Sequence, residues 1–396
     1  MEVAEQSRRA KPAKDNIVRY SSSRFSDGGA FRAENRLHGK TREQIMERTY
    51  ESALGTMHFS EPELYIDNKS RRRSGHMSHA MVQYAPGRII AFNSNCSPKR
   101  VRGHSAFGFV ECRYSNDYAR TWSDIHVVTP TYDALLDGIY THSIEKAVFL
   151  DGTLTCFATS NTQSHDICCE PWEAPVIIRS LDLGRTWEEP VAFCPWRGRI
   201  YDAKEKDGVI YVLMFCNPEF VGRYPDDVYR LFVSTDGGRT FSVRSVVDIE
   251  PVDHGYGALQ FRSDGSLLAY ACNITDAHRL GVSRSDDLGS TWRRLPDIIL
   301  KHGIRNVQIA PMGDGYVMHG RAWLDSERGG RGQVVYASRD GLAWDDGLLL
   351  NTEKRVCYYS NMLPLTLPDG TQKVLVQYSD CYEASCVNVM HMFVSL

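Results

Sequence analysis

From about residue 60 onward, apolar residues come in short runs separated by polar turns, which is the pattern of β-strands. Six stretches share one arrangement: an apolar run, a turn that contains glycine, and a second apolar run. Five of the six stretches have an Asp-Gly pair between their apolar runs, which begins at Asp151, Asp207, Asp264, Asp314 or Asp369. Asp-Gly between apolar runs is a strong signal for a β-hairpin. The six predicted hairpins cover residues 79–92, 145–157, 202–213, 258–270, 307–318 and 362–377.

A repeated eight-residue pattern follows each of the first five hairpins. Its cleanest copy is Ser180-Leu-Asp182-Leu-Gly184-Arg-Thr186-Trp187, and the other copies centre on Asp117, Asp236, Asp287 and Asp340. Recurrence at a period of roughly 50 residues indicates a repeat architecture. Asp and Gly favour a tight turn at each copy, and the aromatic residue that follows is expected to pack between neighbouring repeats.

This Ser-x-Asp-x-Gly-x-Thr-Trp pattern is the Asp box, and the chain resembles the sialidase-like (Asp-box, or BNR-repeat) β-propeller superfamily. The resemblance implies an all-β fold, a six-bladed β-propeller whose boxes lie on the outer rim, away from the ligand face. Each hairpin would form the inner pair of strands of one blade. The sixth blade lacks a box and is one strand short, so we expect residues 62–66 to supply its missing strand and close the ring.

Two regions follow from this interpretation: a propeller over residues 60–396 and an N-terminal arm over residues 1–59. The arm is polar and shows no sustained period until residues 40–53. That segment has helix-forming composition, with Thr41 as a candidate N-cap and Gly55 as a stop, and it predicts one short helix.

Composition narrows the partners of the chain. Acidic and basic residues are interspersed with a net charge of −3, which argues against nucleic-acid binding. No apolar run is long enough to span a membrane, and no signal-peptide pattern begins the sequence. The chain as given is therefore expected to be cytoplasmic, or secreted if a leader has been removed. The odd number of cysteines, 11, fits a reducing compartment with few disulfides. No cofactor is predicted.

The residues just before each inner strand of a propeller line one mouth of its central channel. In this chain four of the six such segments carry a histidine, and the last carries Tyr358 and Tyr359. Neutral imidazoles and phenols that converge on one mouth can exchange protons near neutral pH.

The resemblance also implies a catalytic set, which this chain matches only in part. Sialidases hold the substrate carboxylate with three arginines and use an Asp as acid and a Tyr, activated by a Glu, as nucleophile. Tyr359, followed by Ser360, matches the nucleophile position, and Tyr358 would serve under a shifted register. However, Met77 stands where the family has an arginine, and Tyr256 stands where it has the glutamate. The loop over residues 96–106 contains no aspartate.

We therefore expect a sialidase-like scaffold with a non-standard site rich in His and Tyr. The leading interpretation is a glycoside hydrolase that cleaves an anionic or decorated oligo- or polysaccharide. Two alternatives stay open: a polysaccharide lyase that cleaves a uronic-acid glycan by β-elimination, and a glycan-binding propeller without catalysis. The candidate catalytic residues are Tyr359, His76, His142, Tyr256, Glu145 and Asp202. The candidate substrate-binding residues are His79, Arg199, His254, Arg305, Arg321 and Tyr358.

Three tryptophans and one cluster of histidine and cysteines are further candidates for ligand contact. Trp172, Trp196 and Trp323 lie in loops or at strand ends, where an aromatic face can stack on a sugar or pack in the core. His165, Cys168 and Cys169 bring metal-ligand types together, but their spacing matches no standard zinc pattern, so no metal site is predicted.

Overall fold

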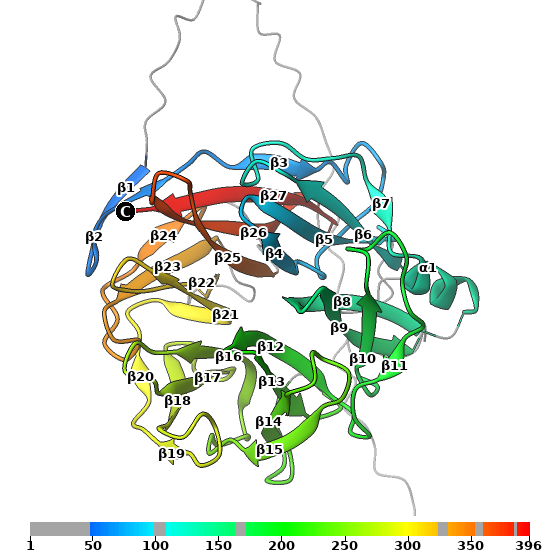
Figure 1. Cartoon of the computed structure of the whole chain (residues 1–396). Helices are drawn as coiled ribbons and strands as arrows, with labels where there is room; N and C mark the ends of the chain where they lie inside the picture. Colours follow the sequence, from blue (N-terminus) through cyan, green and yellow to red (C-terminus); the bar gives the residue numbers. More distant parts are fainter. Residues whose placement is uncertain are drawn as a thin grey trace, which may run out of the picture. The chain divides into compact units, whose positions relative to one another are not determined.

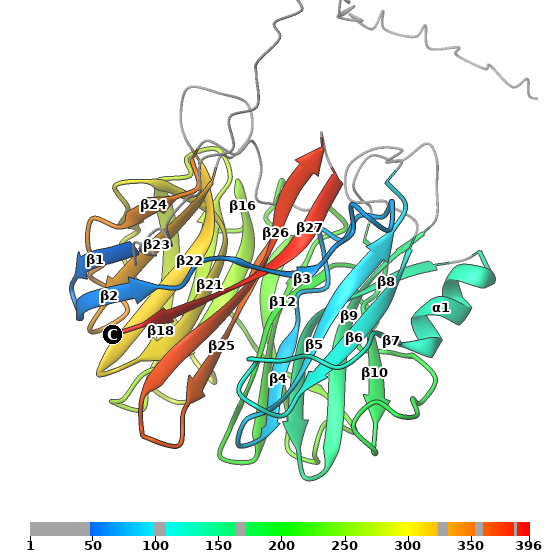
Figure 2. The same cartoon turned by 90° about the horizontal axis from the view of Figure 1, so that it is seen from above.

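The computed structural model describes residues 48–98, 108–138, 140–162, 172–219, 221–323, 332–352, 359–383 and 386–396. Almost every regular element in these ranges is a β-strand, and α1 (Thr129–Leu136) is their single helix. It lies outside the ring of strands (Figures 1 and 2). Over the same ranges, no helix has the length and apolar character needed to cross a bilayer.

The strands form six antiparallel sheets, which are the six blades of a propeller. Figure 1 shows the ring of blades face-on. Blade I consists of β4 (Met81–Ala85), β5 (Arg88–Cys96), β6 (Gly108–Ser115) and β7 (His126–Val127). Blade II consists of β8 (Tyr140–Leu150), β9 (Thr153–Thr162), β10 (Val176–Ser180) and β11 (Val191–Ala192). Blade III consists of β12 (Arg199–Lys206), β13 (Val209–Cys216), β14 (Val228–Ser234) and β15 (Ser242–Val246).

Blades IV to VI continue the ring around the same channel. Blade IV consists of β16 (His254–Phe261), β17 (Leu267–Asn273), β18 (Arg279–Ser285), β19 (Arg293–Arg294) and β20 (Ile298–Ile299). Blade V consists of β21 (Gly303–Met312), β22 (Gly315–Trp323), β23 (Gln333–Ser338) and β24 (Leu348–Leu350). Blade VI consists of β25 (Ser360–Thr366), β26 (Gln372–Glu383) and β27 (Cys386–Ser395), with N-terminal strands outside them. The six-bladed, all-β prediction is confirmed.

The N-terminal strands close the ring, as predicted. β3 (Glu63–Ile66) pairs with β27, the strand that ends near the C-terminus. The hairpin of β1 (Arg48–Ser52) and β2 (Gly55–Phe59) extends this sheet, because β2 also pairs with β27. The helix expected over residues 40–53 is therefore wrong for its second half, which is strand β1; residues 40–47 lie outside the described ranges. Pairing with a hairpin partner outweighs the helical propensity of this segment.

The Asp boxes join neighbouring blades. In the box of blade II, the Ser180 hydroxyl accepts a hydrogen bond from the Gly184 N–H at 2.6 Å, and Asp182 accepts one from the Thr186 N–H at 2.8 Å. The turn packs against blade I, because the Tyr114 hydroxyl donates to the Leu183 carbonyl at 2.9 Å. Gly184 has a φ of +83°, and a Cβ there would lie 2.8 Å from that hydroxyl.

A polar plug, formed by Lys146, Asp202, Gln308 and Asn361, fills the middle of the channel. The Lys146 ammonium donates to the side-chain oxygens of Gln308 and Asn361 at 2.6 and 2.8 Å, and it lies 3.4 Å from Asp202. The second Asp202 oxygen accepts the backbone N–H of Leu259 at 2.8 Å. These bonds connect blades II to VI, and all four plug side chains are buried.

The plug predicts a large loss of stability for Asp202→Ala. Lys146 would keep its charge in a buried position without the carboxylate, which costs about 3–5 kcal/mol. The measurement is the free energy of unfolding in urea. Asp346→Ala is the matched control, because Asp346 forms an exposed ion pair with Lys301 and its loss should change little. Equal stability of the two variants would show that the plug does not hold the ring together.

Candidate functional site

Four inner strands bulge at the same level, near the end of the channel where these strands begin. The register shifts between Ile144 and Lys146 in blade II and between Ile200 and Asp202 in blade III. Blades IV and V shift between Gly255 and Ala258 and between Arg305 and Gln308. A β-bulge redirects side chains and is common beside functional sites. The bulges contain Glu145, Tyr201, Tyr256 and Asn306.

Strained backbone gathers at this level too. Tyr256 and Asn306 have φ angles of 61° and 56°, and Ser78 in blade I has a φ of 62°. Non-glycine residues rarely adopt this left-handed conformation, and such strain is concentrated at functional sites. Backbone geometry therefore points to this end of the channel before any side chain is considered.

Arg199 is the centre of the side chains here. It starts β12, is almost fully buried, and donates from Nη2 to Glu145 Oε2 at 2.9 Å. Its Nη1 lies 3.5 Å from the Tyr359 hydroxyl. The guanidinium carbon also stands 4.9 Å from the ring centre of Tyr359, 5.3 Å from that of Tyr201 and 5.4 Å from that of Trp172. Burial acts to lower the pKa of Arg199, but Glu145 and the phenols hold it well above the ordinary value.

Tyr359 completes this group, which we name the mouth cluster: Arg199, Glu145, Tyr201, Tyr256, Tyr359 and His76. The ring of Tyr359 lies 6.2 Å from that of Tyr256 and 6.3 Å from that of His76, centre to centre. Burial, and then the neighbouring Tyr256, raise the pKa of Tyr359 well above its ordinary value, while Arg199 opposes them. The phenol is therefore neutral at physiological pH, and a base is needed if it is to act as a nucleophile.

Glu145 is the carboxylate available for that task. One oxygen is bound to Arg199, and the other, Oε1, is buried without a hydrogen-bond partner among the described residues. A buried carboxylate oxygen without a hydrogen bond lowers the free energy of unfolding, and such groups often have a functional role. Glu145 lines a small enclosed cavity together with Arg199, Tyr201 and Tyr359.

A second group, which we name the arginine pair, consists of Arg305 and Arg321, directly opposite each other on β21 and β22. Their guanidinium carbons lie 3.6 and 5.9 Å from the ring centre of Trp323. Within the described part of the chain neither arginine has a carboxylate partner, and the Nε of each is buried without a hydrogen bond. Burial and then Arg321 lower the pKa of Arg305, which is the signature of like charges without a counterion.

The arginine pair is electrostatically coupled to the mouth cluster. Arg305 interacts with Tyr256, and Arg321 interacts with Tyr359. Two adjacent cations without a carboxylate between them form a receptor for an anionic group, and arginine suits carboxylate or sulfate because its donors form a planar fork.

The four predicted histidines have different surroundings in the structure. His76 is the one that stands beside Tyr359. His79 also borders the enclosed cavity, but its Nε2 bonds the Ser379 hydroxyl at 2.6 Å across the seam between blades I and VI. His254 bonds the Val252 carbonyl at 2.9 Å, and its ring packs beside Gly281 in its own blade. His142, opposite Ser160 on β9, is buried with a pKa lowered to about 4.

Asp202, a candidate catalytic residue, does not lie beside Glu145. The bulge in blade II skips Glu145 and the bulge in blade III skips Tyr201, so Glu145 corresponds to Tyr201, and Asp202 corresponds to Lys146. Asp202 therefore lies in the plug and not in the mouth cluster. Tyr358 and the loop with His165, Cys168 and Cys169 lie outside the described residues, among which no cluster of metal-ligand side chains was found.

Tyr201, Asn306 and Ser78 were missed as site residues. They occupy the bulges or the strained start of a strand, and neither feature has a sequence signal in this chain. Trp172 proves to be fully buried beneath Arg199, so its ring supports the arginine from below and is not exposed for sugar stacking.

The fold and the boxes place the chain among the sialidase-like propellers. A family model described as the BNR repeat-like domain matches residues 50–371, and the chain belongs to that family. No curated protein matched the sequence significantly.

Solved structures share the fold at low sequence identity. A protein of unknown function from Dyadobacter fermentans DSM 18053 has a TM-score of 0.62 at 13% identity, over 86% of this chain and 99% of that one. The Hadza microbial sialidase Hz136 has a TM-score of 0.63 at 18% identity, over 85% and 68%. A Trypanosoma rangeli sialidase with 2,3-difluorosialic acid as a covalent intermediate has a TM-score of 0.53 at 14% identity, over 85% and 58%. At these identities the likeness shows the fold alone.

The buried histidines predict a loss of stability in acid. Burial lowers the pKa of His79 to about 3 and those of His142 and His319 to about 4, against an ordinary value of 6.5. Below pH 6.5 the unfolded chain binds protons that the folded chain cannot bind. The free energy of unfolding should therefore fall by about 1.4 kcal/mol per pH unit for each histidine between pH 6.5 and about 4.

Urea unfolding at pH 7.5, 6 and 5 measures this slope. In His319→Gln the free energy of unfolding should fall less steeply with decreasing pH than in the wild type, by about 1.4 kcal/mol per pH unit, which is the contribution of one histidine. A free energy of unfolding that is independent of pH over this range would contradict the assignment of these histidines as buried and neutral.

Proposed function

We propose that the protein is a glycoside hydrolase that cleaves an anionic or decorated glycan at the mouth cluster. The observation that carries the proposal is the arginine pair: two partly buried cations that have no carboxylate partner among the described residues stand next to a tyrosine, an arginine and a glutamate that already contact one another. An acidic substituent on a sugar supplies the missing counterion. Solved structures that share the fold include sialidases, which supports a glycosidase activity on this scaffold.

In the proposed reaction the arginine pair holds the acidic group and the Tyr359 hydroxyl attacks the anomeric carbon. The phenolic proton passes to the free oxygen of Glu145, and the leaving oxygen takes a proton from His76, which enters this step as the imidazolium ion. Water then attacks the anomeric carbon and gives a proton to His76, while the released Tyr359 oxygen takes its proton back from Glu145, so the enzyme returns to its starting state. A neutral phenol suits an anomeric centre that carries an adjacent anion, because a carboxylate nucleophile would be repelled.

A uronate lyase is the second candidate, and one observation favours it. Tyr256 and Tyr359 lie side by side, so one could remove the proton next to the uronate carboxylate while the other protonates the leaving oxygen. The arginine pair would then neutralise the carboxylate. The product carries a new carbon–carbon double bond, whereas a hydrolase product does not.

Tyr359→Phe should abolish turnover of acidic oligosaccharides and leave their binding intact, since the ring stays and the hydroxyl is lost. The assay is a library of acidic oligosaccharides, read both for new reducing ends and for ultraviolet absorbance. New reducing ends without the absorbance support a hydrolase, and both together support a lyase. Binding without turnover in the wild type would show a non-catalytic glycan-binding propeller and would end the enzyme proposal.

Arg321→Met should raise KM for the acidic substrate about ten- to a hundredfold, because a hydrogen-bonded contact with a charged group contributes about 1.5–3 kcal/mol. Arg339→Met is the matched control in the same blade, since Arg339 is exposed and pairs with Asp314. Steady-state kinetics on an acidic glycan and its neutral analogue measure both. If the two variants behave alike, the arginine pair does not bind the substrate.

A further inference from the structure

The opposite end of the channel holds a cavity of about 530 Å³. All six inner strands or their turns contribute to its wall, so it is the half of the channel on the side of the hairpin turns. Its size is in the range of small-molecule sites. A neighbouring pocket of about 690 Å³ extends it over the turns of blades I, V and VI and shares Gln83, Phe149, Pro311 and Pro364 with it.

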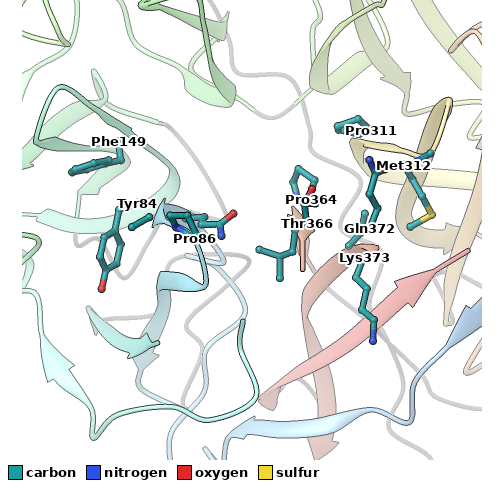
Figure 3. Close-up of a pocket in the computed structure, with 14 residues that line it drawn as sticks. Tyr84, Pro86, Phe149, Pro311, Met312, Pro364, Thr366, Gln372 and Lys373 are labelled. Atoms are coloured by element: carbon teal, nitrogen blue, oxygen red, sulfur yellow. Dashed lines mark hydrogen bonds between the residues drawn. The ribbon is translucent and has the colours of Figure 1, made fainter. Parts of the chain in front are cut away.

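Figure 3 shows the neighbouring pocket as an open space between two groups of side chains. Tyr84, Pro86 and Phe149 lie on one side, and Pro364 and the residues around it lie on the other. The two cavities thus form one route from the hairpin face into the channel, with apolar and aromatic walls at its entrance.

The floor of this route carries more positive than negative charge. Two lysines, Lys146 and Lys204, share the single carboxylate of Asp202, at 3.4 and 3.9 Å. Lys146 donates hydrogen bonds to Gln308 and Asn361 and forms an ion pair with Asp202 at 3.4 Å, so it is surrounded by three oxygen partners. The three side chains together leave one positive charge on a partly buried wall, where a charge without a full partner is costly. Glu205 and Lys206 also line the cavity, but Glu205 is exposed and accepts the Gly208 N–H at 2.8 Å, and Lys206 pairs with Asp207 at 3.0 Å.

Lys204 is the group that carries the surplus charge. Its ammonium has three donors, and two neutral oxygens are within hydrogen-bond distance: the Gln260 side chain at 3.4 Å and the Ile309 carbonyl at 3.0 Å. One N–H is therefore left for the cavity that Lys204 lines. Burial lowers the pKa of Lys204, and although Asp202 partly opposes this, Lys146 reinforces it, as expected where a cation lacks a full partner.

We propose that this half of the channel is a second ligand site, which binds a small sugar acid with its carboxylate on Lys204. One negative charge balances the floor, so a monoanion fits better than a neutral or doubly charged ligand. The Oε1 of Gln308 is bound to Lys146, and its Nε2 can donate to a hydroxyl group of the ligand. Phe149 and Phe261 offer aromatic faces for an apolar face of the ring.

This site is separate from the mouth cluster. Arg199, Glu145 and Tyr359 border the small enclosed cavity and not this one, whereas Asp202, Lys204 and the turn residues border only this one. The plug residues Lys146, Gln308 and Asn361 border both cavities and divide them. The proposal therefore stands independently of the proposed hydrolase activity.

The test is calorimetric titration of the full chain at low ionic strength with D-glucuronate and with uncharged D-glucose. Glucuronate should bind at least about tenfold more tightly than glucose, because only it supplies the charge. Lys204→Met should reduce glucuronate affinity at least about tenfold. Ala147→Phe, which fills the cavity from a half-buried position and leaves every charge in place, should do the same.

Lys301→Met is the matched control, an exposed lysine paired with Asp346 on the outside of the ring, and it should not change the affinity. Arg321→Met separates the two sites: binding that survives it belongs to the hairpin face. Thermal unfolding of each variant verifies that the propeller is intact. The proposal is overturned if glucuronate does not bind, if it binds equally to Lys204→Met and Ala147→Phe, or if Arg321→Met alone removes binding.

Discussion

The plug in the middle of the channel is the contact on which the ring depends most. Each blade is a local antiparallel sheet, and sheets of this kind pack by apolar contacts that do not fix how six of them meet at a common axis. Lys146 and Asp202 fix this, because their bonds reach Gln308, Asn361 and the backbone of Leu259. Five of the six blades thereby share one buried charged network.

The plug also explains why the two ends of the channel differ. On one side the inner strands bulge, and Glu145 and Tyr256 are directed at Arg199 and Tyr359. On the other side the inner strands lead into their hairpins, with a register shift in blade I between Gln83 and Ala85, and they line a wider space. A single layer of polar side chains thus lets one ring present two chemical environments. Among the described residues, the arginine pair lacks a carboxylate partner at one end, and Lys204 shares the carboxylate of Asp202 with Lys146 at the other.

Local signals were sufficient to predict the scaffold. Each Asp-Gly turn and each Asp box is a sequence pattern shorter than ten residues. The six hairpins and the closing strand β3 that were predicted from these patterns are confirmed. Strand β1 was missed because it pairs with β2, which is held in turn by β27, more than 300 residues away. A composition that favours helix cannot reveal such a partner.

The candidate site was harder to predict, because a bulge changes the correspondence between strands by one residue. Glu145 and Asp202 each begin a predicted hairpin, yet the bulges align Glu145 with Tyr201 and leave Asp202 in the plug. His79 and His254 carry the expected side chain, but backbone and seam contacts hold them elsewhere. Residue type pointed to the end of the channel where the inner strands begin, while backbone geometry decided which residues meet there.

A crystal structure with an acidic oligosaccharide bound tests the central claim most directly, that the bulged end of the channel is an acidic-glycan active site. The account predicts that the acidic group lies between Arg305 and Arg321 and that the sugar carbon to be attacked faces the Tyr359 hydroxyl. A ligand that binds with its acidic group away from both arginines, or on the outer rim of the ring, would contradict it.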